Sequence, residues 1–158
     1  MKVKDLMTHN SVSCDMATNL EEVTLRMWNG DFGVMPVTDN FNKVIGIITD
    51  RDIAMASALQ HKSPAEILVG DVIKEHPVFI CHPEDEVKTV LEEMAVDKVR
   101  RLPVVNDEGQ IIGMLSLSDI AAYAGNKKAS SATAAELVNA FKAIAAPHME
   151  HQKMVSAG

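Results

Sequence analysis

The chain contains an internal repeat, and this repeat limits its possible folds more than any other feature. Residues 20–54 align with residues 87–121 without a gap, at a constant offset of 67 positions. The shared positions are apolar residues at helical spacing, a Pro-Val pair, an Ile-Gly pair and an Asp-Ile-Ala triplet. A unit of about 60 residues buries too little surface to be more than marginally stable alone. We therefore expect two similar units that pack sheet to sheet and share one core.

Both halves have the same predicted order of elements. A short helical turn leads to a short strand and then to a helix that begins near Thr18 in the first half and near Asp85 in the second. Thr18 and Glu21 have the spacing of a capping box, which supports the first of these starts. Two strands and a second helix follow in each half. The predicted strands are 11–14, 34–38 and 44–49, then 78–81, 102–106 and 111–116, and the second helices are 51–60 and 118–124.

The resulting prediction is an α+β fold with three parts. Residues 1–62 form the first strand-helix-strand-strand-helix repeat, residues 63–124 form the second, and residues 125–158 form a linker, a C-terminal helix and a polar tail. In the tail, Leu137, Phe141 and Ile144 recur at helical spacing, and Pro147 is expected to end that helix. This apolar face either covers the protein's own repeats or docks on a neighbouring molecule.

Composition excludes several classes of protein. The net charge of −7 argues against a nucleic-acid surface, which requires a basic footprint. The two cysteines, Cys14 and Cys81, stand in corresponding places of the two halves and form no CxxC pair, so we interpret them as small core residues and not as zinc ligands. The sequence shows no signal peptide after Met1 and no apolar run of about 20 residues, so we expect a cytoplasmic protein that spans no membrane.

The end of a predicted strand carries a hydroxyl and a carboxylate in both repeats. Thr49 and Asp52 lie three residues apart in the first corner, and Ser116 and Asp119 do so in the second. An Asp at this spacing is often only a helix cap. A carboxylate can also accept hydrogen bonds from both hydroxyls of a ribose, while the helix N-terminus favours phosphate. Both interpretations remain open. The glycines before each corner, at positions 46 and 113, either leave room for a ligand or mark β-bulges.

The two Gly-x-x-Thr/Ser-x-x-Asp corners, each preceded by a Pro-Val strand, resemble the CBS domain, which is named after cystathionine beta-synthase. The resemblance covers roughly residues 1–124. It implies that the tandem pair, or Bateman module, folds as a pseudo-twofold α+β disc. It also implies that adenine nucleotides (AMP, ADP or ATP) or other adenosyl compounds bind as regulatory ligands in clefts between the repeats, that the protein forms a homodimer, and that it signals to an unidentified regulated protein.

The resemblance also implies roles for individual residues. Asp52 and Asp119 hold a ribose, while Thr49 and Ser116 donate to a ribose or phosphate oxygen. Arg100 and Arg101 have no basic counterparts in the first repeat, and we assign them to phosphates in the second site. Arg51 is the basic residue nearest the first site. The candidate contacts for an adenine ring are Val34, Met35, Pro36, Leu102, Pro103 and Val78.

Two unequal sites follow from this assignment, and the second is expected to dominate for charged nucleotides. The sequence offers no nucleophile–base pair, metal cluster or Gly-rich phosphate loop, so we expect no catalysis and no required cofactor. Two alternatives stay open. One is a scaffold that keeps the CBS fold without binding a nucleotide, and the other is a nucleotide-using enzyme.

Overall fold

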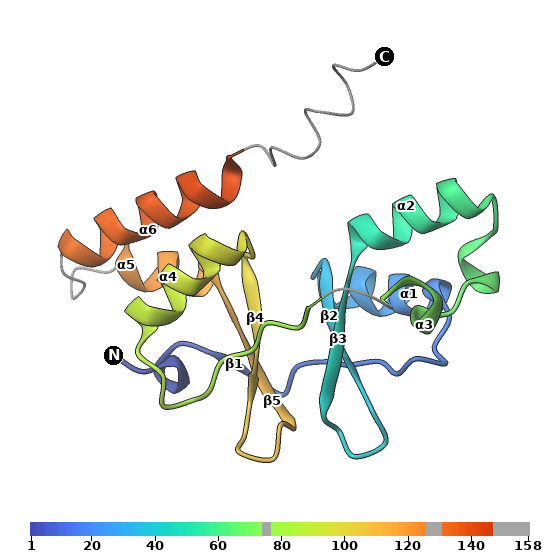
Figure 1. The fold of residues 1–158 in the computed structure, drawn as a ribbon, viewed down its shortest axis with the longest axis horizontal. Helices are drawn as coiled ribbons and strands as arrows, with labels where there is room; N and C mark the ends of the chain where they lie inside the picture. The colour runs from blue at the N-terminus through green and yellow to red at the C-terminus, as the bar shows by residue number, and fades with distance from the viewer. Residues whose placement is uncertain (74–76, 126–130, 147–158) are drawn as a thin grey trace.

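Two small β-sheets, each flanked by helices, lie side by side in the protein (Figure 1). The structure is a computed structural model that describes residues 1–73, 77–125 and 131–146. In the first repeat, β2 (Val34–Thr38) pairs antiparallel with β3 (Val44–Thr49). In the second, β4 (Arg101–Val105) pairs antiparallel with β5 (Ile111–Ser116), and β1 (Thr8–His9) joins the free edge of β5.

The helices occupy corresponding positions in the two repeats. The first sheet lies beside α1 and α2, and the second lies beside α4 and α5 (Figure 1). The bounds of the helices are Leu20–Gly30 for α1, Asp50–Gln60 for α2, Val69–Val72 for α3, Val87–Asp97 for α4, Leu117–Ala124 for α5 and Ser131–Ala145 for α6, with 3₁₀ turns at Val3–Asp5 and Pro64–Glu66. The predicted α+β fold of two repeats followed by a C-terminal helix is confirmed. The predicted starts of α2, β4 and α5 are each one residue late.

Helix α1 begins at Leu20, two residues after the predicted start, because its cap is Asn19 and not Thr18. The Asn19 side chain accepts a hydrogen bond of 2.9 Å from the Glu22 N–H. The Thr18 hydroxyl instead donates to Asp15 Oδ1 at 3.0 Å, inside a turn that precedes the helix. The predicted capping box at Thr18 is therefore wrong, although the apolar face of the helix was predicted correctly.

The predicted strands at 11–14 and 78–81 do not form as strands. Each contributes only one bridge, parallel in both cases, from Cys14 to Val37 and from Cys81 to Val104. Both thiols are buried, and each Sγ donates weakly to a backbone carbonyl, at 3.8 Å for Cys14 and 3.7 Å for Cys81. Burial raises the pKa of Cys14 to about 11 and that of Cys81 to about 12. Protonated thiols of this kind behave as small core residues.

Both long hairpins contain a bulge next to their glycine. The pairing of β2 with β3 skips Ile45, between Val37 opposite Gly46 and Thr38 opposite Val44, and the pairing of β4 with β5 skips Ile112 in the same way. A side chain at Gly113 would place its Cβ 2.6 Å from the Thr8 carbonyl oxygen. Gly113 therefore allows the close approach of β1, and the bulge interpretation of the two glycines is confirmed.

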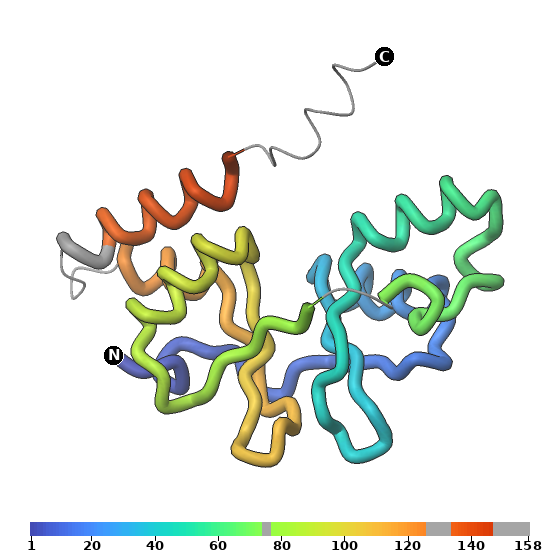
Figure 2. The backbone as a smooth tube through the Cα atoms, in the orientation of Figure 1, coloured from blue at the N-terminus to red at the C-terminus, as the bar shows by residue number. Residues whose placement is uncertain are grey.

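The repeats have two separate cores, so the expected shared core is wrong. The core of the first repeat takes in Ile67, Val69 and Ile73, which lie at the start of the second repeat in the sequence. The core of the second takes in Val3, from the start of the chain. Figure 2 shows this exchange, since the N-terminal segment lies beside the second repeat and the segment around α3 lies beside the first. Each core is thus completed by the segment that leads into the other repeat.

The tips of the two hairpins connect the repeats directly. Lys43 and Gln110 form an antiparallel bridge. The Val44 N–H donates to the Gly109 carbonyl and the Ile111 N–H donates to the Asn42 carbonyl, both at 3.1 Å. These backbone bonds hold the tips together, and the opposite ends of the strands carry the two corners where α2 and α5 begin.

Helix α6 packs on α4 and α5 of its own chain, with Ala140 and Ile144 only 4% and 6% exposed. Lys88 on α4 forms an ion pair of 3.1 Å with Glu136 on α6. The sequence placed Phe141 on the same inward face, but the structure leaves it 57% exposed, because Ala140 occupies that contact. The predicted linker at 126–131, except its last residue, the predicted helix end at Pro147 and the predicted polar tail from His148 onward lie outside the described residues.

Candidate functional site

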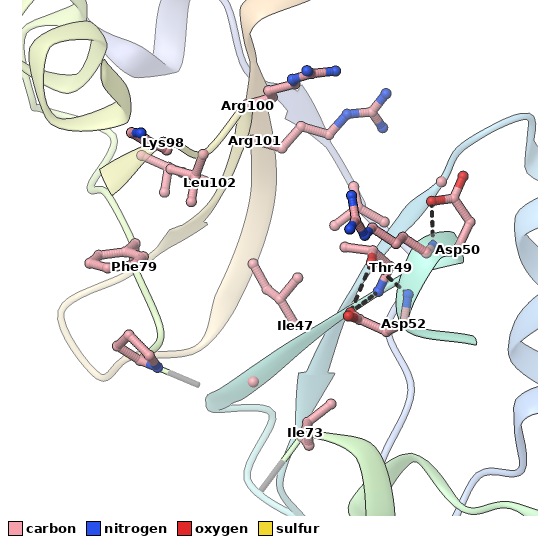
Figure 3. Close-up of a pocket in the computed structure, with 16 residues that line it drawn as sticks. Ile47, Thr49, Asp50, Asp52, Ile73, Phe79, Lys98, Arg100, Arg101 and Leu102 are labelled. Carbon is pink, nitrogen blue, oxygen red and sulfur yellow. Dashed lines mark hydrogen bonds between the residues drawn. The ribbon is translucent and has the colours of Figure 1, made fainter. Parts of the chain in front are cut away.

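A cleft of about 750 Å³ opens between the two repeats (Figure 3). Its floor and one wall come from β3 and the start of α2, and its other wall comes from the segment that leads into β4. The residues that line it are Gly33, Val34, Gly46, Ile47, Thr49, Asp50, Arg51, Asp52, Ile73, Pro77, Phe79, Lys98, Val99, Arg100, Arg101 and Leu102. This volume is in the range of small-molecule sites in proteins.

The carboxylate of the first corner lines this cleft and keeps one oxygen out of its capping bonds. Asp52 Oδ2 accepts hydrogen bonds from the Thr49 N–H at 2.9 Å and the Thr49 hydroxyl at 2.8 Å, while that hydroxyl accepts from the Asp52 N–H at 3.1 Å. These bonds form a capping box at the start of α2. Within the described residues, Asp52 Oδ1 has no hydrogen-bond partner. The cap and ligand interpretations are therefore compatible, because the cap uses only Oδ2.

The Thr49 hydroxyl has a different role from the predicted one. Its proton is already donated to Asp52, so it offers a ligand an acceptor and not the donor that the sequence suggested. What remains available at this corner is the Asp52 Oδ1 acceptor and the N-terminal end of α2. Together these can accept a hydroxyl proton and attract a negative group.

The second corner repeats this geometry. Asp119 Oδ2 accepts from the Ser116 N–H at 2.8 Å and from the Ser116 hydroxyl at 2.6 Å, and the Asp119 N–H donates back at 3.2 Å. Neither residue lines the cleft. The two corners are therefore equal as helix caps, but only the first belongs to the cleft.

Two arginines of the second repeat line the same cleft as the first corner. Arg100 and Arg101 were assigned to the second site because they have no basic counterparts in the first repeat, and Arg101 is paired with Ser116 across the sheet. Their side chains extend instead across the cleft toward the first repeat, where Thr49 and Asp50 lie (Figure 3).

The cleft carries a positive balance of charge. Its lining contains four cationic side chains and two carboxylates, those of Asp50 and Asp52. Among the described residues, Arg51, Arg100 and Arg101 have no hydrogen-bond or ion-pair partner on their guanidinium groups. Guanidinium groups without protein partners can bind phosphate oxygens in a bidentate manner.

The apolar lining agrees only in part with the residues predicted from the sequence. Val34 and Leu102 line the cleft, whereas Met35, Pro36 and Pro103 are buried in their sheets and Val78 lies between two lining residues without contacting the cleft. Sequence reasoning missed four apolar residues, which are Ile47, Ile73, Pro77 and Phe79. The alternation of residues along β3 could have indicated Ile47, but no local pattern indicates the others. Ile73 comes from the exchanged segment, while Pro77 and Phe79 lie outside any regular helix or strand.

The described residues contain no group of three or more His, Cys, Asp or Glu side chains that could hold a metal ion. In the same part of the chain, no helix has the length and apolar character needed to cross a bilayer.

A family model described as the CBS domain matches residues 3–59 and again residues 69–126. The chain therefore belongs to the CBS domain family and carries two CBS repeats. It is 32% identical over 133 residues to the protein YlbB of Bacillus subtilis, and the match covers 83% of this chain and 88% of that protein. It is also 39% identical over 87 residues to an inosine-5′-monophosphate dehydrogenase of Methanocaldococcus jannaschii, but it spans only 16% of that enzyme.

Solved structures of CBS proteins share this fold. The CBS domain pair of protein MJ0100, solved in complex with 5′-methylthioadenosine and S-adenosyl-L-methionine, superposes with a TM-score of 0.70 at 26% identity, over 81% of this chain and 98% of that one. The CBS domain protein TA0289 of Thermoplasma acidophilum superposes with a TM-score of 0.72 at 21% identity, over 90% of this chain and 76% of that one. The second likeness concerns the fold alone.

Proposed function

We propose that the cleft binds an adenine nucleotide or a related adenosyl compound, and that the chain is a regulatory sensor of that ligand. The observation that carries this proposal is that a carboxylate from the first repeat and two arginines from the second line the same cleft. Asp52 Oδ1 accepts from a ribose hydroxyl, and Arg100 and Arg101 contact the phosphates. Val34, Leu102 and the neighbouring apolar residues enclose the base.

The charge of the lining favours AMP, ADP or ATP over an adenosyl compound without phosphate, because the guanidinium groups of Arg51, Arg100 and Arg101 have no partner among the described residues. The complex of the MJ0100 pair with two adenosyl compounds supports the broader ligand class. Ser116 and Asp119 are proposed as a weaker corner. It has the same free acceptor, but Gly33 and Val34 stand where the second repeat has its arginines.

Binding without chemistry is part of this proposal. The polar groups of the cleft suit hydrogen bonds to hydroxyls and phosphates, and no base is positioned beside the Thr49 hydroxyl except the Asp52 carboxylate that caps the helix. The alternative of a nucleotide-using enzyme predicts steady ATP hydrolysis above that of a Thr49→Ala/Ser116→Ala double variant. The alternative of a scaffold predicts that no adenosyl compound binds.

Calorimetric titration with adenosine, AMP and ATP tests the proposal. AMP and ATP should bind more tightly than adenosine. The Arg101→Ala change should lower the affinity for AMP by about tenfold or more and leave the affinity for adenosine nearly unchanged. Lys62→Ala is the matched control, because it removes one exposed cation outside the cleft. Equal losses in both variants would mean that only net charge matters, and no binding of any of the three compounds would reject the sensor.

Assembly and location complete the proposal. We propose a homodimer in the cytoplasm that passes the ligand signal to a regulated protein, as the family resemblance implies. Light scattering at micromolar concentration tests the dimer, and a monomer mass would reject it. The proposed units of the chain are residues 1–62, 63–124 and 125–158, as the repeat indicates.

A further inference from the structure

The two arginines of the cleft lie on a short connecting segment. Residues 98–101 lead from the end of α4 into β4, and all four line the cleft. Two backbone hydrogen bonds tether this segment. The Val99 N–H donates to the Met94 carbonyl of α4 at 3.1 Å, and the Arg100 carbonyl accepts from the Leu117 N–H of α5 at 3.0 Å. The position of the arginines therefore depends on both α4 and α5.

Helix α6 packs on the same two helices. Its Ala140 and Ile144 are buried members of the second core. Met94 and Leu117, which tether the arginine segment, belong to the same core. Val99 packs against this core and also lines the cleft. Because protein interiors are close-packed and transmit strain, the packing of α6 reaches the cleft through a single layer of side chains.

The buried contacts of α6 lie toward the end of α4 from which the arginine segment extends. The two helices lie side by side and run in the same direction (Figure 1). The ion pair of Lys88 with Glu136 sets their register near their N-terminal ends. Ile144 follows Glu136 by eight residues, or about 12 Å along the helix axis, which brings it level with the last turn of α4.

We propose that α6 is a positioning helix for the phosphate half of the nucleotide site. With α6 packed, α4 and α5 hold the segment so that Arg100 and Arg101 extend across the cleft (Figure 3). With α6 released, the core loses Ala140 and Ile144, and the arginines lose their fixed backbone. Asp52 belongs to the first repeat and keeps its place.

This inference rests on the proposed nucleotide site and adds to it a helix that lies beyond both CBS repeats. The coupling is reciprocal, because two linked equilibria must affect each other by the same factor. Release of α6 weakens the binding of a nucleotide that carries phosphate, and such a nucleotide in turn favours the packed α6. Adenosine, which has no phosphate, takes little part in this coupling.

The Ile144→Asp variant of the full chain tests the first direction. It places a carboxylate at a position that is only 6% exposed, which releases α6. Calorimetry should show that AMP binds about fivefold or more weakly, as is typical of coupled sites. Adenosine should bind within about twofold of the unchanged chain. Phe141→Asp is the matched control, because it adds the same charge to the same helix at a position that is 57% exposed, and it should leave both affinities nearly unchanged.

Hydrogen exchange of the unchanged chain tests the reverse direction and does not depend on whether Ile144→Asp folds. Saturating AMP should slow exchange of the amides around Ala140 by about the same factor that Ile144→Asp costs in AMP affinity, and adenosine should not. The Lys88→Glu variant should speed this exchange by about two- to fivefold, as expected for one exposed ion pair. The Lys88→Glu/Glu136→Lys double variant should restore it.

Three results would overturn the inference. Equal losses of AMP and adenosine in Ile144→Asp would mean that α6 only stabilises the fold. Unchanged AMP affinity in that variant would mean that the arginines do not depend on α6, and exchange of the α6 amides that ignores AMP would mean that no coupling exists. All three leave the nucleotide site in place, because the unchanged chain still binds AMP. If the unchanged chain binds no AMP, the proposed function fails, and this inference fails with it.

Discussion

Replacing Asp52 by Asn separates the capping role of this residue from its proposed ligand role. In the structure, Oδ2 holds both capping bonds, at 2.9 and 2.8 Å, and Oδ1 is the acceptor left for a ligand. An Asn can keep the capping bonds with its carbonyl oxygen, but it then presents an NH₂ group to the cleft. The free energy of unfolding should therefore fall by less than about 1 kcal/mol, mainly through the lost charge at the helix N-terminus.

Ligand binding should suffer far more. A hydrogen bond to a charged group contributes about 1.5–3 kcal/mol, so AMP should bind roughly ten- to a hundredfold more weakly to the Asp52→Asn variant. Calorimetry measures this affinity, and urea unfolding measures the stability of the same samples. Asp119→Asn is a matched control, because its capping bonds of 2.8 and 2.6 Å are nearly the same while it lies outside the cleft.

The control should lose a similar amount of stability and keep its AMP affinity within about twofold, which is less than 0.5 kcal/mol. The opposite pattern, with AMP lost only in Asp119→Asn, would place the nucleotide at the second corner. Unchanged AMP binding in both variants would mean that the two carboxylates are only helix caps.

Three further predictions concern stability. Ile144→Ala should lower the free energy of unfolding by about 2–5 kcal/mol and Phe141→Ala by less than about 1 kcal/mol, because the first side chain is 6% and the second 57% exposed; urea unfolding that gives equal losses would contradict this. Gly113→Ala should lower the melting temperature more than Gly46→Ala, because its new Cβ meets backbone 2.6 Å away, whereas the one at position 46 meets only a flexible isoleucine tip; the reverse order would contradict this. Burial raises the pKa of Cys81 from 9.0 to about 12, so the thiol ionises at lower pH in the unfolded chain than in the folded one. Stability should therefore fall as the pH rises above 9, by about 1 kcal/mol at pH 10 relative to a Cys81→Ala variant. Parallel curves of stability against pH for the two proteins would contradict this.

The repeat made the fold predictable, because each element was indicated twice. The long strands and the apolar faces of α1 and α4 follow from patterns within about 15 residues of sequence. The predictions that failed depended on contacts between residues far apart in the sequence. The predicted strands at 11–14 and 78–81 form only single bridges. The two cores are separate, and each includes a leading segment that crosses from the other repeat. Periodicity carries no information about which repeat a short segment joins.

The candidate site was also predictable from the sequence only in part. The capping geometry of Thr49 and Asp52 could be predicted from their spacing alone. The position of the Arg100 and Arg101 side chains could not, because it depends on how the two repeats pack against each other, and both side chains line the cleft beside the first corner. The sequence also left open whether the tail helix covers its own chain, which is decided by Ala140 and Ile144 packing on the second core.

The exchange of leading segments has a consequence for synthesis of the chain on the ribosome. The first core stays incomplete until Ile67, Val69 and Ile73 have emerged, and Val3 must wait for partners about 80 residues or more further along, such as Asp85, whose carbonyl accepts its N–H at 2.9 Å. The first core has all of its residues once Ile73 has emerged, whereas the second core needs residues up to Ile144 of α6. Val3 therefore stays without most of its core partners after the first repeat is complete.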